Sequence, residues 1–228
     1  MTKPKIIYAE DDETLAFLTK DSLENYGFNV YHCANGKSCI EMFDEEKFDI
    51  CILDIMMPIL DGFEVATHIR SKDSNIPIIF LSAKTLKEDR IKGLKLGADD
   101  FLIKPFSMEE LILKIEIFRQ RSQKNDSNSS KYLSLGIFQL DCQNYVLKAT
   151  NIKINLTQRE SELLRFFIEN KNIVLKREHI LKQLWGDDDY FMGRSLDVFI
   201  SRLRKILISD KNISIENLHG IGFRLNLN

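Results

Sequence analysis

The chain of 228 residues lacks a long apolar run, a clustered cysteine motif and a secretion signal. Its apolar stretches are a few residues long, far short of the roughly 20 residues that span a membrane. Met1 to Lys5 lead directly into a strand-like run, without the apolar core of a signal peptide. None of the four cysteines forms a CxxC pair, which favours buried free thiols over disulfides or a zinc site. These absences predict a cytoplasmic protein with no membrane partner.

Excess charge is scarce overall, but the two halves differ in sign. The formal net charge is −2. Residues 1–121 carry 16 Lys and Arg against 22 Asp and Glu, whereas residues 131–228 carry 15 against 11. An acidic half joined to a basic half indicates that only the second half meets nucleic acid.

A polar segment of low complexity separates these halves. Residues 122–130 contain no apolar side chain, which is typical of a flexible linker. The length suffices for two ordinary domains. We therefore predict a first domain over residues 1–121, a linker over 122–131 and a second domain over 132–228.

Strand-like and helical stretches alternate through the first half. Five of each, interleaved, are typical of an α/β domain with a doubly wound parallel sheet. Strands are expected over 5–9, 29–33, 49–53, 77–81 and 101–103. Helices are expected over 13–26, 36–46, 61–71, 86–96 and 107–121.

The second half has a different pattern, which predicts an α+β domain. Residues 132–156 alternate apolar and polar side chains, as small antiparallel strands do. Thr157 and Glu160 have the spacing of a capping box and begin a first helix. Two further helices are expected over 176–185 and 195–207. Residues 213–227 indicate a hairpin that turns around two glycines.

Polar and charged side chains stand at the ends of several predicted strands in the first half. Glu10 and Asp11 follow the first strand, Asp54 the third, Ser82 the fourth and Lys104 the fifth. The carboxyl ends of parallel strands meet at one edge of a sheet. Clustered carboxylates favour a hard divalent cation, and a hydroxyl beside an ammonium suits a phosphoryl group. Singly, each residue could be a surface carboxylate or a helix cap. Together they predict a Mg²⁺-dependent phosphoryl site with Asp54 as nucleophile.

Residues 4–121 resemble the receiver domain of a two-component response regulator. The matching segments are Glu10-Asp11-Asp12, residues 53–58, Asp61-Gly62, residues 81–84 and residues 104–106. The resemblance implies that Asp54 accepts a phosphoryl group from the phosphohistidine of a sensor histidine kinase.

The same resemblance implies a role for each further residue of the site. Mg²⁺ would be bound by Asp11, Asp54 and the backbone carbonyl of Met56, with Glu10 acting directly or through water. Ser82 and Lys104 would hold phosphoryl oxygens. Phe101 occupies the switch position, where the family often has tyrosine.

Residues 132–228 resemble the winged helix-turn-helix effector domain of the OmpR/PhoB subfamily. The matching stretches are residues 156–164, 177–185, 194–205 and 220–224. At 100° per residue, Leu196, Ile200, Leu203 and Leu207 share one face of the third helix, which predicts core. The other side would lie in the major groove of double-stranded promoter DNA. A solvated helix face is the alternative, which the helix–turn–helix–hairpin context disfavours.

The DNA contacts expected of this side differ in kind. Arg202 should read a base, because bidentate contacts of arginine with guanine are common. Ser195, Phe199 and Ser201 flank it, whereas Arg194, Arg204 and Lys205 should touch phosphates. In the wing, His219 replaces the arginine of many relatives, which predicts weak minor-groove readout. The acidic loop over residues 186–193 either meets RNA polymerase or is simply exposed.

The resemblance further implies a homodimer on phosphorylation, formed through the fourth helix, fifth strand and fifth helix. The charged residues that match this interface are Arg90, Lys95, Asp100, Glu110, Lys114 and Glu116. Exposed ion pairs are individually weak, so a solvated surface is the alternative. Two linked winged helices would read a direct repeat of sites.

The sequence therefore predicts a phosphorylation-dependent transcription factor rather than an enzyme with turnover beyond slow self-dephosphorylation. One alternative is a regulator that binds DNA without phosphorylation. Another is a Mg²⁺-dependent phosphohydrolase with an aspartate nucleophile. Such enzymes commonly need an acid two residues after the nucleophile, and here that residue is Met56.

Overall fold

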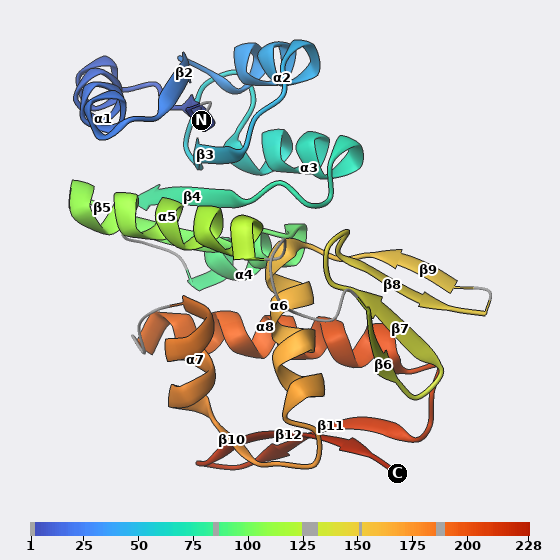
Figure 1. Cartoon of the computed structure of the whole chain (residues 1–228). Coiled ribbons are helices and arrows are strands. Elements are labelled where there is room, and N and C mark those ends of the chain that lie inside the picture. Colours follow the sequence, from blue (N-terminus) through green and yellow to red (C-terminus); the bar gives the residue numbers. More distant parts are fainter. Residues whose placement is uncertain (1–2, 84–86, 125–131, 151, 186–189) are drawn as a thin grey trace. The chain divides into compact units, whose positions relative to one another are not determined.

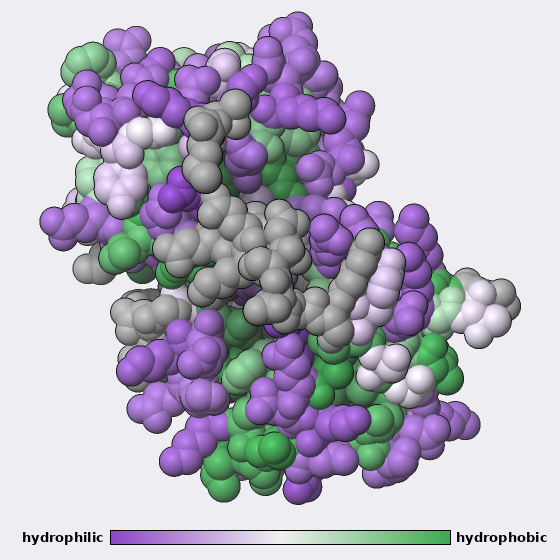
Figure 2. All heavy atoms as spheres, viewed as in Figure 1, coloured by the Kyte–Doolittle hydropathy of each residue, from purple (hydrophilic) through white to green (hydrophobic). Residues whose placement is uncertain are grey.

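The computed structural model describes residues 3–83, 87–124, 132–150, 152–185 and 190–228. The chain divides into two compact units, Met1–Glu116 and Ile117–Asn228. Hydrophilic side chains make up most of the visible surface of both units (Figure 2). In the described part of the chain, no helix is long and apolar enough to cross a membrane. The four cysteines are buried free thiols, as predicted.

The first unit is a five-stranded parallel sheet flanked by helices (Figure 1). Its strands are β1 Lys5–Ala9, β2 Asn29–Cys33, β3 Ile50–Asp54, β4 Ile78–Ala83 and β5 Asp100–Lys104. Its helices are α1 Glu13–Tyr26, α2 Gly36–Glu45, α3 Gly62–Lys72, α4 Lys87–Leu96 and the first part of α5 Met108–Lys124, whose later residues belong to the second unit. Every predicted strand and helix of this half is confirmed, with ends that shift by up to three residues.

The strand order β2-β1-β3-β4-β5 decides where a ligand can bind. The step from β1 to β2 crosses the sheet in the opposite direction from the three later steps. Right-handed crossovers therefore place α1 on one face and α2, α3 and α4 on the other. The order reverses between β1 and β3, and open α/β sheets bind ligands at such a point, beyond the carboxyl ends of the strands.

Side-chain caps fix the helices that begin at this edge. Asp12 accepts hydrogen bonds from the amides of Thr14 and Leu15 at the start of α1. Asp61 forms a capping box with Glu64 at the start of α3. Each cap satisfies amides that a helix N-terminus leaves without a partner. The strand ends are thereby followed by well-defined helix starts.

In the described residues, the second unit contains two antiparallel sheets and three helices besides the end of α5. A four-stranded sheet is formed by β6 Tyr132–Leu135, β7 Phe138–Asp141, β8 Val146–Ala149 and β9 Ile152–Asn155. The helices are α6 Gln158–Glu169, α7 Arg177–Trp185 and α8 Tyr190–Leu207. The three-stranded sheet contains β10 Leu175–Lys176, β11 Ile213–Leu218 and β12 Gly222–Leu227, and it ends in the predicted hairpin.

Two elements of this unit differ from the prediction. Helix α8 begins at Tyr190 rather than at Ser195, although Gly193 lies within its first turns. A helical glycine costs about 1 kcal/mol relative to alanine, which makes an early start of this helix hard to predict. Strand β10 was not predicted, because two residues carry no periodicity. It exists through its pairing with Gly222 and Phe223 of β12.

Candidate functional site

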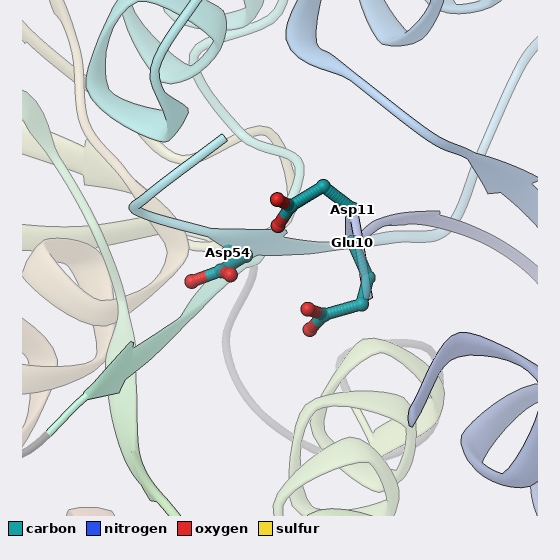
Figure 3. A group of neighbouring side chains, drawn as sticks. All are labelled: Glu10, Asp11 and Asp54. Carbon is teal, nitrogen blue, oxygen red and sulfur yellow. The ribbon is translucent and has the colours of Figure 1, made fainter. Parts of the chain in front are cut away.

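Three carboxylates gather at the point where the strand order reverses. Glu10 and Asp11 directly follow β1, and Asp54 is the last residue of β3. One oxygen from each lies within 4.8 Å of the other two. Figure 3 shows the side chains of Glu10 and Asp11 leaving the chain in different directions, with Asp54 coming from the neighbouring strand. Glu10 and Asp54 are buried, whereas Asp11 is exposed. The structure thus brings the predicted carboxylates together.

Lys104, at the end of β5, binds both buried carboxylates. Its Nζ lies 2.7 Å from Asp54 Oδ2 and 2.7 Å from Glu10 Oε2. Burial by itself lowers the pKa of Lys104, but its hydrogen bonds with Asp54 and Glu10 outweigh burial, so the pKa is raised. The pKa of Glu10 is also raised, chiefly by burial, although Lys104 opposes the shift. Lys104 therefore stays charged and compensates the carboxylates only in part.

The chemistry of this donor set fits a divalent cation. Two full negative charges about 4 Å apart repel by about 4 kcal/mol in a typical protein environment. Carboxylate oxygens are the ligands that Mg²⁺ and Ca²⁺ prefer. Glu10, Asp11 and Asp54 could hold such an ion, and it would relieve their repulsion.

The segment after Asp54 is held close to the pocket. The amide of Met56 lies 3.3 Å from Asp54 Oδ1, whereas the Met56 side chain is exposed. The amide of Gly62 donates to the Ile55 carbonyl at 3.0 Å. A Cβ at Gly62 would lie 2.2 Å from the carbonyl oxygen of Asp54, so this close approach requires glycine. The predicted ligand, the Met56 carbonyl, therefore belongs to a tightly folded turn.

Ser82 lies on β4, the strand next to that of Asp54, and Phe101 lies on β5, one strand further along the sheet. Asp54 pairs with Leu81, so Ser82 is the next residue of β4. Its hydroxyl is buried and donates to the Ala83 carbonyl at 3.0 Å. The ring of Phe101 is buried 5.4 Å from that of Phe80. The expected switch residue is thus turned inward.

The DNA-facing side of α8 is narrower than predicted. Ser195 and Phe199 are buried, and the ring of Phe199 lies 5.7 Å from that of Trp185. Both residues belong to the core, which corrects the expectation that they touch DNA. Ser195 and Phe199 directly precede Leu196 and Ile200 in the sequence. The buried face of α8 is therefore wider than the single stripe of leucines and isoleucine that was predicted.

Arg202 continues the line of Ser195 and Phe199 and pairs with a buried residue of α6. Its Nε lies 2.7 Å from Oε1 of Glu160, and its side chain remains 30% exposed. Arg204 donates twice to the Ile215 carbonyl of β11, at 2.9 and 2.7 Å. Both arginines thus help to hold α8 in place. The sequence predicted only a capping role for Glu160, because residue spacing does not indicate an ion-pair partner 42 residues away.

The other predicted DNA contacts are exposed or lie outside the described side chains. Ser201 and Lys205 are exposed on α8. His219 is exposed between β11 and β12, at the turn of the hairpin. The side chain of Arg194 and residues 186–189 of the acidic loop are outside the described part of the chain. The exposed line of α8 therefore contains Ser201 and Lys205.

Two of the predicted dimer residues pair within the chain. Lys114 Nζ lies 3.1 Å from Asp100 Oδ2, and both side chains are buried. This corrects the expectation of exposed charges, because either charge buried alone would be costly. Lys95 and Glu110 are exposed and Glu116 is half-buried. The side chain of Arg90 is outside the described residues.

Comparisons with known proteins agree with this arrangement. Residues 6–116 match the response regulator receiver domain, and residues 151–225 match the C-terminal domain of transcriptional regulatory proteins. The transcriptional regulatory protein RprY of Bacteroides fragilis is 42% identical over 98% of this chain and 94% of its own length. The transcriptional regulatory protein PrrA of Mycobacterium tuberculosis is 32% identical over 100% of this chain and 98% of its own.

Solved structures resemble both halves. DrrB of Thermotoga maritima, an OmpR/PhoB homologue, is 27% identical with a TM-score of 0.52 and covers 99% of this chain and 100% of its own. A RitR mutant, 19% identical over 99% of this chain and 100% of its own, has a TM-score of 0.76 and shows the fold alone. These relatives are transcriptional regulators, which disfavours a phosphohydrolase. The chain belongs to the two-component response regulators that join a receiver domain to an OmpR/PhoB-type DNA-binding domain and regulate transcription.

Proposed function

We propose that Asp54 accepts a phosphoryl group from a sensor histidine kinase and that this controls binding to promoter DNA. The observation that carries the proposal is Lys104, whose ammonium bridges Asp54 and Glu10 beside Asp11. Phosphoryl transfer needs positioning and charge compensation more than covalent assistance. This pocket offers both at one sheet edge.

The transfer follows from the positions of the chain's own groups. A carboxylate oxygen of Asp54 forms a bond to phosphorus while the bond from phosphorus to the kinase histidine nitrogen breaks, and the nitrogen keeps the electron pair. Bound Mg²⁺ would supply further positive charge beside the phosphoryl oxygens. Lys104 orients Asp54 beforehand and can follow the new charge, because its side chain is partly exposed. Repulsion among the carboxylates of Glu10, Asp11 and Asp54 favours a bound cation in the pocket over an anion.

The signal then passes through Ser82 and Phe101. The Ser82 hydroxyl donates to a backbone carbonyl in this structure and would turn to the phosphoryl oxygens, which are strong acceptors. This turn changes the space beside Phe101 on the neighbouring strand. A local change of charge thereby biases the conformation of β5 and α4.

The output is binding to double-stranded DNA by α8 and the β11–β12 wing. The support is the exposed line of Ser201 and Lys205, with His219 at the turn of the wing. We propose that phosphorylation promotes a homodimer that binds direct-repeat promoter sites in the cytoplasm. The exposed Lys95 and Glu110 are its candidate contacts. A contact with RNA polymerase belongs to the same proposal.

Phosphorylation of the intact chain tests the central proposal. The purified protein is incubated with acetyl phosphate and Mg²⁺, and the added mass is measured by mass spectrometry. The unsubstituted chain should gain one phosphoryl group, and Asp54→Asn should gain none. Asp61→Asn is the matched control, since Asp61 caps α3 and should leave labelling intact. Full labelling of Asp54→Asn would refute the assignment.

A further inference from the structure

Tyr8 places a hydroxyl inside the apolar strand β1. Its neighbours Ile6, Ile7 and Ala9 are buried, and Tyr8 itself is 0% exposed. An unpaired buried hydroxyl costs about 1–3 kcal/mol, and phenylalanine would fill the same core without this cost. The hydroxyl oxygen lies 3.4 Å from Oε2 of Glu10. Thr19 on α1 also borders the phenol. The phenol is therefore aimed at the pocket.

The strand geometry explains this contact. Residues two apart in a strand project to the same face, so Tyr8 lies directly behind Glu10. A carboxylate can only accept, so the phenol is the donor. The carboxylate of Glu10 thus contacts Tyr8 on the protein side as well as Lys104 at the sheet edge.

His32 fixes the backbone of the same residue from β2. It pairs with Tyr8 in the sheet register, and their ring centroids are 5.8 Å apart. Its Nε2 lies 2.8 Å from the carbonyl oxygen of Glu10, which accepts, so Nε2 carries a hydrogen. The amide of Glu10 donates to the Cys33 carbonyl at 3.1 Å. Glu10 is therefore held at its amide, its carbonyl and its carboxylate.

We propose that Tyr8 and His32 are positioning residues that hold Glu10 ready for a divalent cation, an inference that rests on the proposed function of the pocket. A free glutamate side chain loses up to about 2 kcal/mol of rotamer entropy when it is fixed. Groups that hold ligands in place typically contribute 10–100-fold to metal affinity. Tyr8 and His32 reduce the freedom that Glu10 would otherwise lose on binding.

Binding of Mn²⁺ alone to the full chain tests the role of Tyr8. Free Mn²⁺ is followed by electron paramagnetic resonance as protein is added. Tyr8→Phe should weaken binding by about tenfold, at the lower end of such effects. Tyr31→Phe is the matched control, because it removes a phenol from the neighbouring strand β2, where the phenol accepts a hydrogen bond from Asn29 Nδ2 at 3.3 Å. It should leave Mn²⁺ affinity unchanged.

His32 supplies a second pair of variants should Tyr8→Phe fail to fold, as judged by circular dichroism. His32→Phe removes the donor to Glu10 and should weaken Mn²⁺ binding by about tenfold, the lower bound of such effects. His32→Gln places an amide nitrogen near the position of Nε2 and should restore the Mn²⁺ affinity. Equal affinity in all folded variants would overturn this inference alone. If the unsubstituted chain takes up no Mn²⁺, the proposed metal site fails and the inference with it. Loss of acetyl phosphate labelling with Mn²⁺ binding intact would contradict only the proposed function.

Discussion

The ring of Phe101 lies against Gly93 of α4, where only a glycine leaves room for it. A Cβ at Gly93 would stand 2.6 Å from Cζ of Phe101 and 2.9 Å from Cε2 of Phe80. The inward position of the Phe101 ring therefore depends on both β5, which carries the ring, and α4, which carries Gly93. Because the ring packs directly on the backbone of α4 at Gly93, a movement of the ring in the proposed switch would also affect the position of α4.

Gly93→Ala should destabilise the protein by about 1–3 kcal/mol, because an added methyl group overpacks the core. Urea unfolding of the full chain measures the change. In a Phe101→Ala background, Gly93→Ala should cost much less than it does alone, since the clash partner is then gone. Lys95→Ala, an exposed change on the same helix, is the control and should be nearly neutral. If the losses of the two single variants simply add in the double variant, Gly93 and Phe101 do not pack against each other as described.

Glu10→Gln should change the pH dependence of stability. The folded pKa of Glu10 is raised above its ordinary value of 4.5, so its contribution is fully present below that value and lost as pH rises through the raised pKa. Without metal, Glu10→Gln should therefore be more stable than the unsubstituted chain at neutral pH. The difference should vanish in acid and reverse when Mg²⁺ is added. The midpoints of urea unfolding, measured at several pH values, give the difference in stability between the two proteins. A difference that does not change with pH would contradict a raised pKa of Glu10.

Arg202→Ala should destabilise the second unit as well as alter DNA binding. It leaves the buried carboxylate of Glu160 without its ion-pair partner, at a cost of about 1–3 kcal/mol. Adding Glu160→Gln should recover part of this stability, which thermal unfolding would reveal. We also expect Arg202→Ala to relax sequence choice in binding assays on mutated sites. Unchanged stability would show that the ion pair contributes little.

Lys205→Ala should weaken DNA binding evenly across sequences. Lys205 is exposed on α8, where it is expected to touch a phosphate. Losing one phosphate contact should flatten the slope of log affinity against log salt by about one. Fluorescence anisotropy at several salt concentrations measures both quantities. Lys211→Ala removes an exposed lysine beyond α8 and serves as the comparison. An equal effect of both variants would argue against the placement.

Periodicity and strand ends predicted most of the fold and the acidic pocket. The carboxyl ends of parallel strands must meet, so Glu10, Asp54 and Lys104 could be grouped from the sequence alone. Periodicity failed where the width of a buried stripe mattered, as for Phe199 on α8. It also cannot show which partner a charge chooses across elements. The pair of Asp100 with Lys114 therefore emerged only from the structure.

The charge balance of the pocket follows from the bridge at Lys104. When ionised, three carboxylates and one ammonium leave two negative charges, which a single divalent cation neutralises. The proposed phosphorylation would replace the single charge of Asp54 with about two. A pocket that was electrically neutral then holds about one negative charge in excess. That excess would persist only until the acyl phosphate is hydrolysed, so the rate of hydrolysis would set how long Ser82 is attracted to the phosphoryl oxygens.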